Sequence, residues 1–263
     1  MIDPSPESVA LWITDAPARA DAPGMRVRRF EFTSRGDRVP GVLLSPADAA
    51  GPVPLVLMQH GAGGSKDAVY LGPVRNPWVR RGVAVASIDF PLHGERLSAK
   101  LTDQLLATFA TPARPHPDTV ALFGEFATQA VTDLSRALDA LAAVPDLDAE
   151  RTAYVAFSLG AILGSLYIPY DARIRAAVLA VGGAGIGPPT LDPTAHIGAF
   201  APRPLLFVNA ARDERIPRAA AEALHAAARD PKEVAWFDAG HHDLPGQALK
   251  KMWSFVATHL GVG

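Results

Sequence analysis

Ser158 stands at the apex of a short turn between two predicted elements. Residues 151–157 are a run of β-branched, aromatic and small residues with the length of a strand. Residues 159–166 have the pattern of a helix, with Gly160 and Gly164 four residues apart on one face. Because no room is left for an ordinary loop, the sequence predicts a tight corner that points the Ser158 hydroxyl outward.

The residues two positions before and two after this serine are small, as such a corner requires. Ala156 and Gly160 would lie against neighbouring backbone, where a large side chain would clash. Glycine is commoner at the position of Ala156, but a methyl group still meets the steric need. The alternative interpretation is an ordinary strand-to-helix turn, with Ser158 in the core or capping the helix, and five residues alone do not exclude it.

Other polar clusters also follow predicted strands directly. They are residues 60–66, Asp89, Asp213 and His241. In a parallel sheet the carboxyl ends of the strands meet at one edge, and ligand sites gather there. The shared placement predicts that these clusters lie together with Ser158.

Serine, aspartate and histidine together can perform nucleophilic catalysis. A serine hydroxyl is a poor nucleophile until a base takes its proton, and the base needs a partner that fixes its tautomer. Ser158, Asp213 and His241 supply these three residue types, and they do so in the order Ser, Asp, His.

The chain resembles the α/β-hydrolase superfamily, in its esterase and dienelactone-hydrolase-like group, whose members have this order of the three residues. The resemblance covers about residues 25–260. It rests on five stretches, residues 60–66, 89–94, 156–160, 212–217 and 239–242. It implies a serine hydrolase, and no stretch defines the substrate.

By this resemblance Ser158 is the nucleophile, His241 is the general base and then the acid, and Asp213 is the orienting carboxylate. His242 is the competing base, and Glu214 is the competing carboxylate. His241 is preferred because it directly follows a glycine, as in the family pattern. In the alternative interpretation His242 makes local hydrogen bonds and Glu214 is a surface residue of the turn.

Ester hydrolysis places negative charge on the carbonyl oxygen, so N–H donors must already point there. The two candidates for this oxyanion hole are the backbone N–H of Leu159, at the helix start, and that of Ala62, in the glycine-rich loop. The alternative for the loop is a plain glycine-rich turn. We expect His60 to hold the loop by hydrogen bonds, and Asp89 and His93 to brace the next turn; substrate contact by His93 is less favoured.

The elements that must position these residues alternate along the chain. Strands at residues 25–33 and 39–44 form an antiparallel hairpin. Further strands are predicted at residues 55–59, 83–89, 151–157, 174–181, 204–210 and 233–237, and helices at residues 67–81, 102–110, from Asp118 to before Pro145, 159–166, 218–229 and 247–260. Repeated strand–helix units predict an α/β fold with a mostly parallel central sheet and helices on both faces.

We expect residues 1–263 to form a single domain, because no linker or change of composition marks a second one. Residues 1–24 are predicted to be an N-terminal arm, with a short helix or an extended segment at residues 8–13. Residues 97–117 are interpreted as a small lid over the site. The alternative for them is a surface excursion with no role.

Composition excludes several classes of partner and chemistry. The 263 residues are 49% hydrophobic and 20% charged, with a net charge of −2, so a buried core is expected and nucleic acid is not an expected partner. There is no cysteine, which excludes disulfides, thiolate metal sites and cysteine nucleophiles. We expect a cytoplasmic protein with no signal peptide and no membrane partner. The histidines have no metal-ligand spacing and no glycine-rich run matches a nucleotide loop, so no metal and no cofactor are predicted.

The sequence thus predicts a carboxylesterase that cleaves short-chain or small esters through an acyl-enzyme, with a small-molecule ester as its partner. A small group is favoured because the insert at residues 97–117 is short. A thioesterase, a lactonase or a peptidase would use the same three residues. A non-catalytic binding protein on this fold is the alternative from another class. Epoxide hydrolases and dehalogenases of this fold need an aspartate at the corner, so Ser158 excludes their chemistry.

Overall fold

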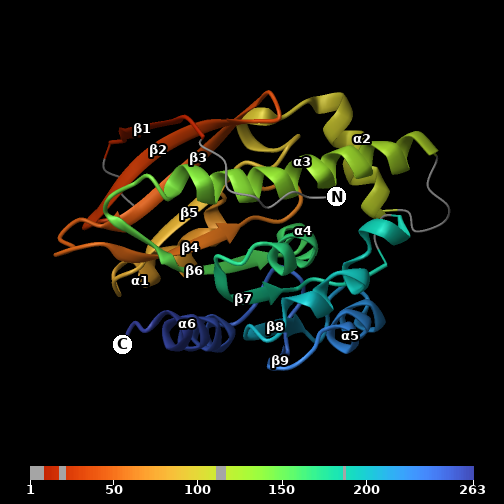
Figure 1. Ribbon diagram of the computed structural model, residues 1–263. Helices are drawn as coiled ribbons and strands as arrows, with labels where there is room; N and C mark the ends of the chain where they lie inside the picture. The colour runs from red at the N-terminus through yellow and green to blue at the C-terminus, as the bar shows by residue number, and fades with distance from the viewer. Residues whose placement is uncertain (1–8, 18–21, 111–116, 186–187) are drawn as a thin grey trace.

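A computed structural model of the chain describes residues 9–17, 22–110, 117–185 and 188–263 (Figure 1). Its strands form one sheet in the order β1-β2-β3-β5-β4-β6-β7-β8-β9. Their bounds are β1 (Leu11–Asp15), β2 (Met25–Ser34), β3 (Asp37–Pro46), β4 (Val53–Gln59), β5 (Ala84–Ile88), β6 (Leu147–Phe157), β7 (Ile174–Ala180), β8 (Leu205–Ala210) and β9 (Lys232–Phe237).

The α-helices of the described residues lie between these strands in the chain, except α6, which follows β9. They are α1 (Gly72–Val79), α2 (Ala99–Ala110), α3 (Pro117–Leu141), α4 (Leu159–Tyr167), α5 (Arg218–Ala227) and α6 (Gly246–Leu260). Short 3-10 turns lie at η1 (Val69–Leu71), η2 (Gly94–Arg96), η3 (Ile168–Tyr170), η4 (Pro189–Leu191), η5 (Pro193–Ala195) and η6 (Ile197–Phe200).

The sheet has an antiparallel part and a parallel part. Strands β1, β2 and β3 pair antiparallel, and β3 pairs antiparallel with β5. From β5 through β4 to β9 every neighbouring pair is parallel. This is the α/β architecture with an N-terminal hairpin that the sequence predicts. Of the two expectations for residues 8–13, the extended one is correct for the described part, because β1 pairs with β2; residue 8 lies outside the described residues.

Consecutive residues of β4 belong to opposite cores, which shows that helices cover both faces of the sheet. Leu55 and Leu57 pack with residues of α3, α4 and α5. Val56 and Met58 pack with residues of α1 and α6. A strand that is buried on both faces needs apolar residues at every position, which explains the uninterrupted apolar run in this strand. Figure 1 shows α3 lying across the sheet, with α6 on its other side.

Several predicted helix boundaries are wrong, and proline explains two of them. The helix predicted from residue 67 begins only at Gly72, after the turn η1, with Pro73 in its first turn. Helix α3 begins at Pro117, so Asp118 lies within its first turn instead of capping it. Proline is favoured at the first helical position because its missing N–H is not needed there. The helix predicted at residues 102–110 extends back to Ala99.

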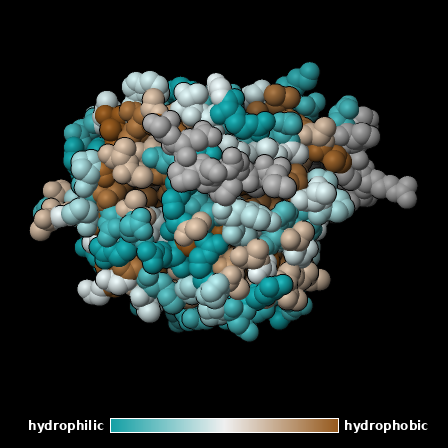
Figure 2. Space-filling view, in the orientation of Figure 1, coloured by the Kyte–Doolittle hydropathy of each residue, from teal (hydrophilic) through white to brown (hydrophobic). Residues whose placement is uncertain are grey.

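The face of the molecule seen in Figure 2 mixes polar and apolar side chains, with the apolar ones in separate small groups. Scattered apolar groups of this kind are usual on a folded protein surface. Of the helices that the structure describes, none combines the length and apolar character that a membrane crossing requires.

Candidate active site

Ser158 lies between β6 and α4 in a strained backbone conformation, with φ of 52° and ψ of −117°. A positive φ is unfavourable for a residue with a Cβ and is found where surrounding structure imposes it, often at functional sites. The side chain makes no capping hydrogen bond to α4, which argues against the alternative of a helix cap. The predicted tight corner is therefore present.

Small residues let the loop that follows β4 approach this corner. A Cβ added to Gly160 would lie 2.7 Å from the backbone oxygen of His60 and 3.2 Å from the Cβ of Ala156. A Cβ added to Gly61 would lie 3.1 Å from the Cβ of Ser158. The strand-to-helix corner and the glycine-rich loop are thus in direct contact, as residues at adjacent strand ends can be.

The structure brings Ser158, His241 and Asp213 into one hydrogen-bonded chain. His241 Nε2 lies 2.9 Å from Ser158 Oγ, and His241 Nδ1 lies 2.9 Å and 2.8 Å from the two carboxylate oxygens of Asp213. A carboxylate only accepts hydrogen bonds, so it holds the proton on Nδ1 and leaves Nε2 free to accept the serine proton.

Asp213 stays ionised in this arrangement. Burial raises the pKa of its carboxyl group, but hydrogen bonds from His241 and from the backbone N–H groups of Ile216 and Arg215 outweigh that effect, so its pKa is lowered. The side chains of His241 and Asp213 are only 3% and 6% exposed. Shielding from water strengthens the attraction between the carboxylate and an imidazolium.

Glu214 is an exposed residue of the turn, as in the alternative interpretation, and it also contacts the backbone of His241. Its Oε2 accepts the backbone N–H of His241 at 3.1 Å, and this hydrogen bond lowers the pKa of the Glu214 carboxyl group. A Cβ added to Gly240 would lie 3.1 Å from Asp243 Oδ1 and 3.2 Å from the same Glu214 oxygen, so a side chain at this position would be in tight contact with both carboxylates. Two neighbouring carboxylates thus hold one histidine, Asp213 by its ring and Glu214 by its backbone.

His242 lies beside the hydrogen-bonded chain. Its ring makes an edge-to-face contact with the ring of His241, with centroids 4.9 Å apart, and it faces the cavity described below. The Ser158 hydroxyl hydrogen-bonds to the ring of His241 and not to that of His242.

His60 holds the loop after β4 by two hydrogen bonds. Its Nδ1–H donates to the backbone oxygen of Gly61 at 2.8 Å, and its Nε2 accepts the backbone N–H of Phe90 at 3.3 Å. Burial lowers the pKa of His60 to about 4, so the ring is neutral at neutral pH. These contacts agree with the structural role expected for this residue.

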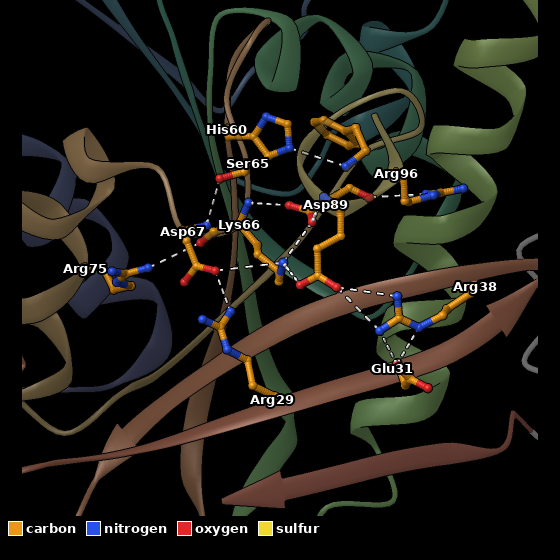
Figure 3. A network of polar contacts seen from close by, with 12 residues as sticks. Arg29, Glu31, Arg38, His60, Ser65, Lys66, Asp67, Arg75, Asp89 and Arg96 are labelled. Carbon is orange, nitrogen blue, oxygen red and sulfur yellow. Dashed lines mark hydrogen bonds and ion pairs between the residues drawn. The ribbon is translucent and has the colours of Figure 1, made fainter. Parts of the chain in front are cut away.

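A buried ion-pair network joins this loop to the loop after β5 (Figure 3). Asp89 is fully buried and accepts the backbone N–H of Lys66 at 2.7 Å and that of Glu95 at 2.9 Å. Lys66 Nζ contacts Asp89 at 2.8 Å and Glu95 at 2.7 Å. A Cβ added to Gly94 would lie 2.3 Å from the Asp89 carboxyl group. Asp89 braces the turn after its strand, as expected, and it also holds the loop after β4, where no sequence pattern pointed to the role of Lys66.

His93 is buried and packs against rings. It is 1% exposed, its Nδ1 lies 2.8 Å from the backbone oxygen of Pro91, and its ring lies between those of His60 and Phe126. The bracing role expected for His93 agrees with these contacts, and the less favoured substrate contact does not.

A cavity of about 400 Å³ opens at Ser158. It is lined by Gly61, Ala62, Tyr70, Pro73, Val74, Phe157, Ser158, Val181, His241, His242, Leu244 and Leu249. None of these side chains is a lysine, an arginine or a carboxylate. Part of the wall comes from η1, from α1 and from α6 with the segment before it, none of which has a sequence motif that predicts a site.

The two residues that were predicted to form the oxyanion hole are Ala62 and Leu159. Ala62 lines the cavity beside Ser158, and Leu159 is the first residue of α4, so its N–H has no partner within the helix. Val181 has a φ of 46°, which is rare for a β-branched residue and marks strain at the cavity wall. Of the expected lid, residues 97–107 do not line this cavity, and residues 111–116 lie outside the described residues.

No cluster of three or more histidine, aspartate or glutamate side chains suited to a metal ion is present among the described residues.

Comparisons with known proteins identify the fold. No protein-family model matches the chain, and no curated protein sequence matches it significantly. Solved structures do match. A cold-adapted esterase from an Arctic intertidal metagenomic library has a TM-score of 0.74 at 20% identity, over 94% of this chain and 99% of that one. Acetyl xylan esterase from Paenibacillus sp. R4 has a TM-score of 0.77 at 17% identity, over 96% and 90%.

A third match is a protein from Klebsiella pneumoniae subsp. pneumoniae MGH 78578 that is provisionally assigned as a dienelactone hydrolase. Its TM-score is 0.66 at 17% identity, over 97% of this chain and 99% of that one. The chain therefore has the α/β-hydrolase fold of esterases and dienelactone-hydrolase-like proteins. At these identities the likeness concerns the fold.

Proposed function

We propose that the protein is a serine hydrolase that cleaves small, uncharged carboxylic esters through an acyl-enzyme. The observation that carries this proposal is the hydrogen-bonded chain from Ser158 through His241 to Asp213 at the wall of a cavity. A binding protein would need none of these contacts, and a strained serine would only cost it stability.

In the first half of the reaction His241 Nε2 takes the proton of Ser158 while Oγ attacks the ester carbonyl carbon. The carbonyl π electrons move to the oxygen and form a tetrahedral oxyanion. Collapse of this intermediate re-forms the C=O bond and expels the alkoxide, which takes the proton from His241 and leaves as an alcohol. Asp213 stabilises the imidazolium that exists between these steps and keeps the ring in the required tautomer.

In the second half a water molecule takes the place of the alcohol. His241 accepts its proton as the water oxygen attacks the acyl-enzyme carbonyl, and the second oxyanion collapses with return of the proton to Ser158 Oγ. The acid product leaves. In both halves the backbone N–H groups of Ala62 and Leu159 are the proposed oxyanion donors, because one lines the cavity and the other opens α4 beside Ser158.

The cavity supports the choice of substrate class. Its lining is mainly apolar and contains no lysine or arginine side chain that could pair with an anionic substrate. A volume of about 400 Å³ is at the lower end of small-ligand sites, which favours a compact ester. The names of two matching structures, an esterase and an acetyl xylan esterase, agree with ester chemistry and with a small acyl group.

The test combines a fluorophosphonate probe with p-nitrophenyl esters of increasing acyl length. We expect the probe to label the wild-type protein, and Ser158→Ala to abolish labelling and to lower turnover by about 10⁴- to 10⁶-fold. Ser165→Ala is the matched control, because Ser165 lies in the same helix with its hydroxyl bonded to the Ala161 backbone oxygen at 2.9 Å. Unchanged turnover or labelling of Ser158→Ala would refute the assignment, and parallel assays with thioesters and lactones distinguish the related activities.

A further inference from the structure

Tyr70 brings a phenol hydroxyl into the cavity that contains Ser158. It lies in the turn η1, and its Oη accepts the backbone N–H of Gly61 at 2.7 Å. A Cβ added to Gly64 would lie 3.1 Å from Oη, so the glycine-rich loop encloses the hydroxyl from two sides. The hydroxyl is thus an acceptor toward the loop, and its own proton is left for a different partner.

The hydroxyl is hydrogen-bonded to the loop that contacts Ser158. A Cβ added to Gly61, whose N–H donates to this hydroxyl, would lie 3.6 Å from Ser158 Oγ. Tyr70, Ala62 and Ser158 line the same cavity. The Tyr70 ring makes an edge-to-face contact with Phe157, the residue directly before Ser158, at 6.2 Å between centroids. The phenol is therefore held from both the loop and the strand that make the site.

The hydroxyl keeps its proton at neutral pH and has no competing acceptor in the described structure. Burial raises the pKa of the Tyr70 hydroxyl, more than the hydrogen bond with Gly61 lowers it. Tyr70 as a residue is 47% exposed, and the glycine-rich loop lies against its Oη. Among the described residues Tyr70 Oη makes its hydrogen bond as an acceptor from Gly61.

We propose that Tyr70 is a catalytic residue whose hydroxyl donates a third hydrogen bond to the oxyanion, beside the backbone N–H groups of Ala62 and Leu159. This inference rests on the proposed ester hydrolysis. As Ser158 Oγ bonds to the carbonyl carbon, the π electron pair moves to the carbonyl oxygen, and the proton goes to His241. Tyr70 keeps its proton throughout and only donates a hydrogen bond that strengthens as negative charge develops.

The hydrogen bond from Gly61 N–H supports this role. An N–H donor on the phenol oxygen draws electron density from it and makes its O–H a stronger donor, since linked hydrogen bonds polarise one another. The same bond also suggests a simpler alternative, in which Tyr70 only holds the Gly61–Ala62 peptide in place. The two roles predict opposite responses to a change in the acidity of the phenol.

The first experiment compares Tyr70→Phe with Tyr170→Phe on the same p-nitrophenyl ester. Tyr170 is a matched control because it is 41% exposed and its hydroxyl bonds to His196, which does not line the cavity. We expect Tyr70→Phe to lower kcat by about 10²-fold with little change in KM, as loss of one oxyanion donor does. Tyr170→Phe should keep the wild-type rate within about twofold. A thermal unfolding curve for each variant shows whether it is folded.

The second experiment replaces Tyr70 with 3-fluorotyrosine, which keeps the ring and the hydroxyl but makes the phenol more acidic. At a pH below the pKa of the fluorinated phenol, a hydroxyl that donates to the oxyanion becomes a stronger donor, so kcat should rise by about two- to fivefold. If Tyr70 only accepts the Gly61 N–H, fluorination weakens the acceptor and kcat should fall. A fall, or a Tyr70→Phe rate within about twofold of the wild type, overturns the proposal.

These experiments test the role of Tyr70 separately from the proposed ester hydrolase activity. If the wild-type protein neither hydrolyses esters nor reacts with the fluorophosphonate at Ser158, the ester hydrolase itself is refuted, and Tyr70 has no oxyanion to serve. If the wild type is active and its activity depends on Ser158 while the Tyr70 variants match it, only the role of Tyr70 is refuted.

Discussion

Two adjacent carboxylates contact His241, and isosteric substitutions separate their roles. Asp213→Asn removes the charge that faces Nδ1, where the two oxygens lie 2.9 Å and 2.8 Å away. Glu214→Gln removes a charge of the same sign one residue along the chain, but its amide oxygen can still accept the His241 backbone N–H. The pair is therefore a matched test of which carboxylate orients the base.

The expected loss for Asp213→Asn follows from the geometry. Unit charges on a carboxylate and an imidazolium about 4 Å apart attract by about 4 kcal/mol at an effective dielectric constant of about 20, which is about 10³ in rate. The amide N–H₂ can also turn toward Nδ1 and favour the wrong tautomer of His241, so a loss of about 10⁴ in kcat is expected. Glu214→Gln only exchanges a charged acceptor for a neutral one, so less than about tenfold is expected.

The assay is kcat for a p-nitrophenyl ester, measured for all three proteins at the same pH between about 7 and 8. Far-ultraviolet circular dichroism and thermal unfolding check that both variants are folded. An Asp213→Asn variant that keeps more than about a tenth of the wild-type kcat would refute the reasoning. A larger loss in Glu214→Gln than in Asp213→Asn would transfer the orienting role to Glu214.

Two further predictions concern the support of the site. Gly160→Ala should lower the free energy of unfolding by about 1–3 kcal/mol, because its Cβ would lie 2.7 Å from the His60 backbone oxygen. Gly124→Ala, in open space within α3, is the control and should raise the free energy of unfolding by up to about 1 kcal/mol; urea unfolding measures both. The pKa of His60 is about 4 in the folded protein, against 6.5 for the free side chain. Between pH 6.5 and 4 the unfolded chain therefore binds a proton on this imidazole that the folded chain does not. The free energy of unfolding should therefore fall by about 3 kcal/mol as the pH falls from 6.5 to 4, and His60→Asn should remove this part of the slope; equal slopes in urea titrations of the two proteins would contradict it.

The sequence determined the local features of the site. The run of strand residues before Ser158 and the small residues around it predict the tight corner, because backbone sterics act over a few residues. The placement of polar clusters after apolar strands predicts that they meet at one edge of a parallel sheet. The strand-type and helix-type periodicities are properties of neighbouring residues, so the α/β architecture was also accessible from the sequence.

Tertiary structure decided how neighbouring candidates differ. Asp213 and Glu214 are adjacent in the sequence, and only the path of the segment before α6 places one at the His241 ring and the other at its backbone. No sequence pattern predicts a role for Tyr70, because its turn contains no motif. The role proposed for its hydroxyl depends on the contact with Gly61, which only the tertiary structure shows. His241 and Ser158 are separated by 83 residues, and the order of β6, β7, β8 and β9 brings them within 2.9 Å. Sequence patterns report on neighbours along the chain, whereas distances of this kind are set by how whole elements pack.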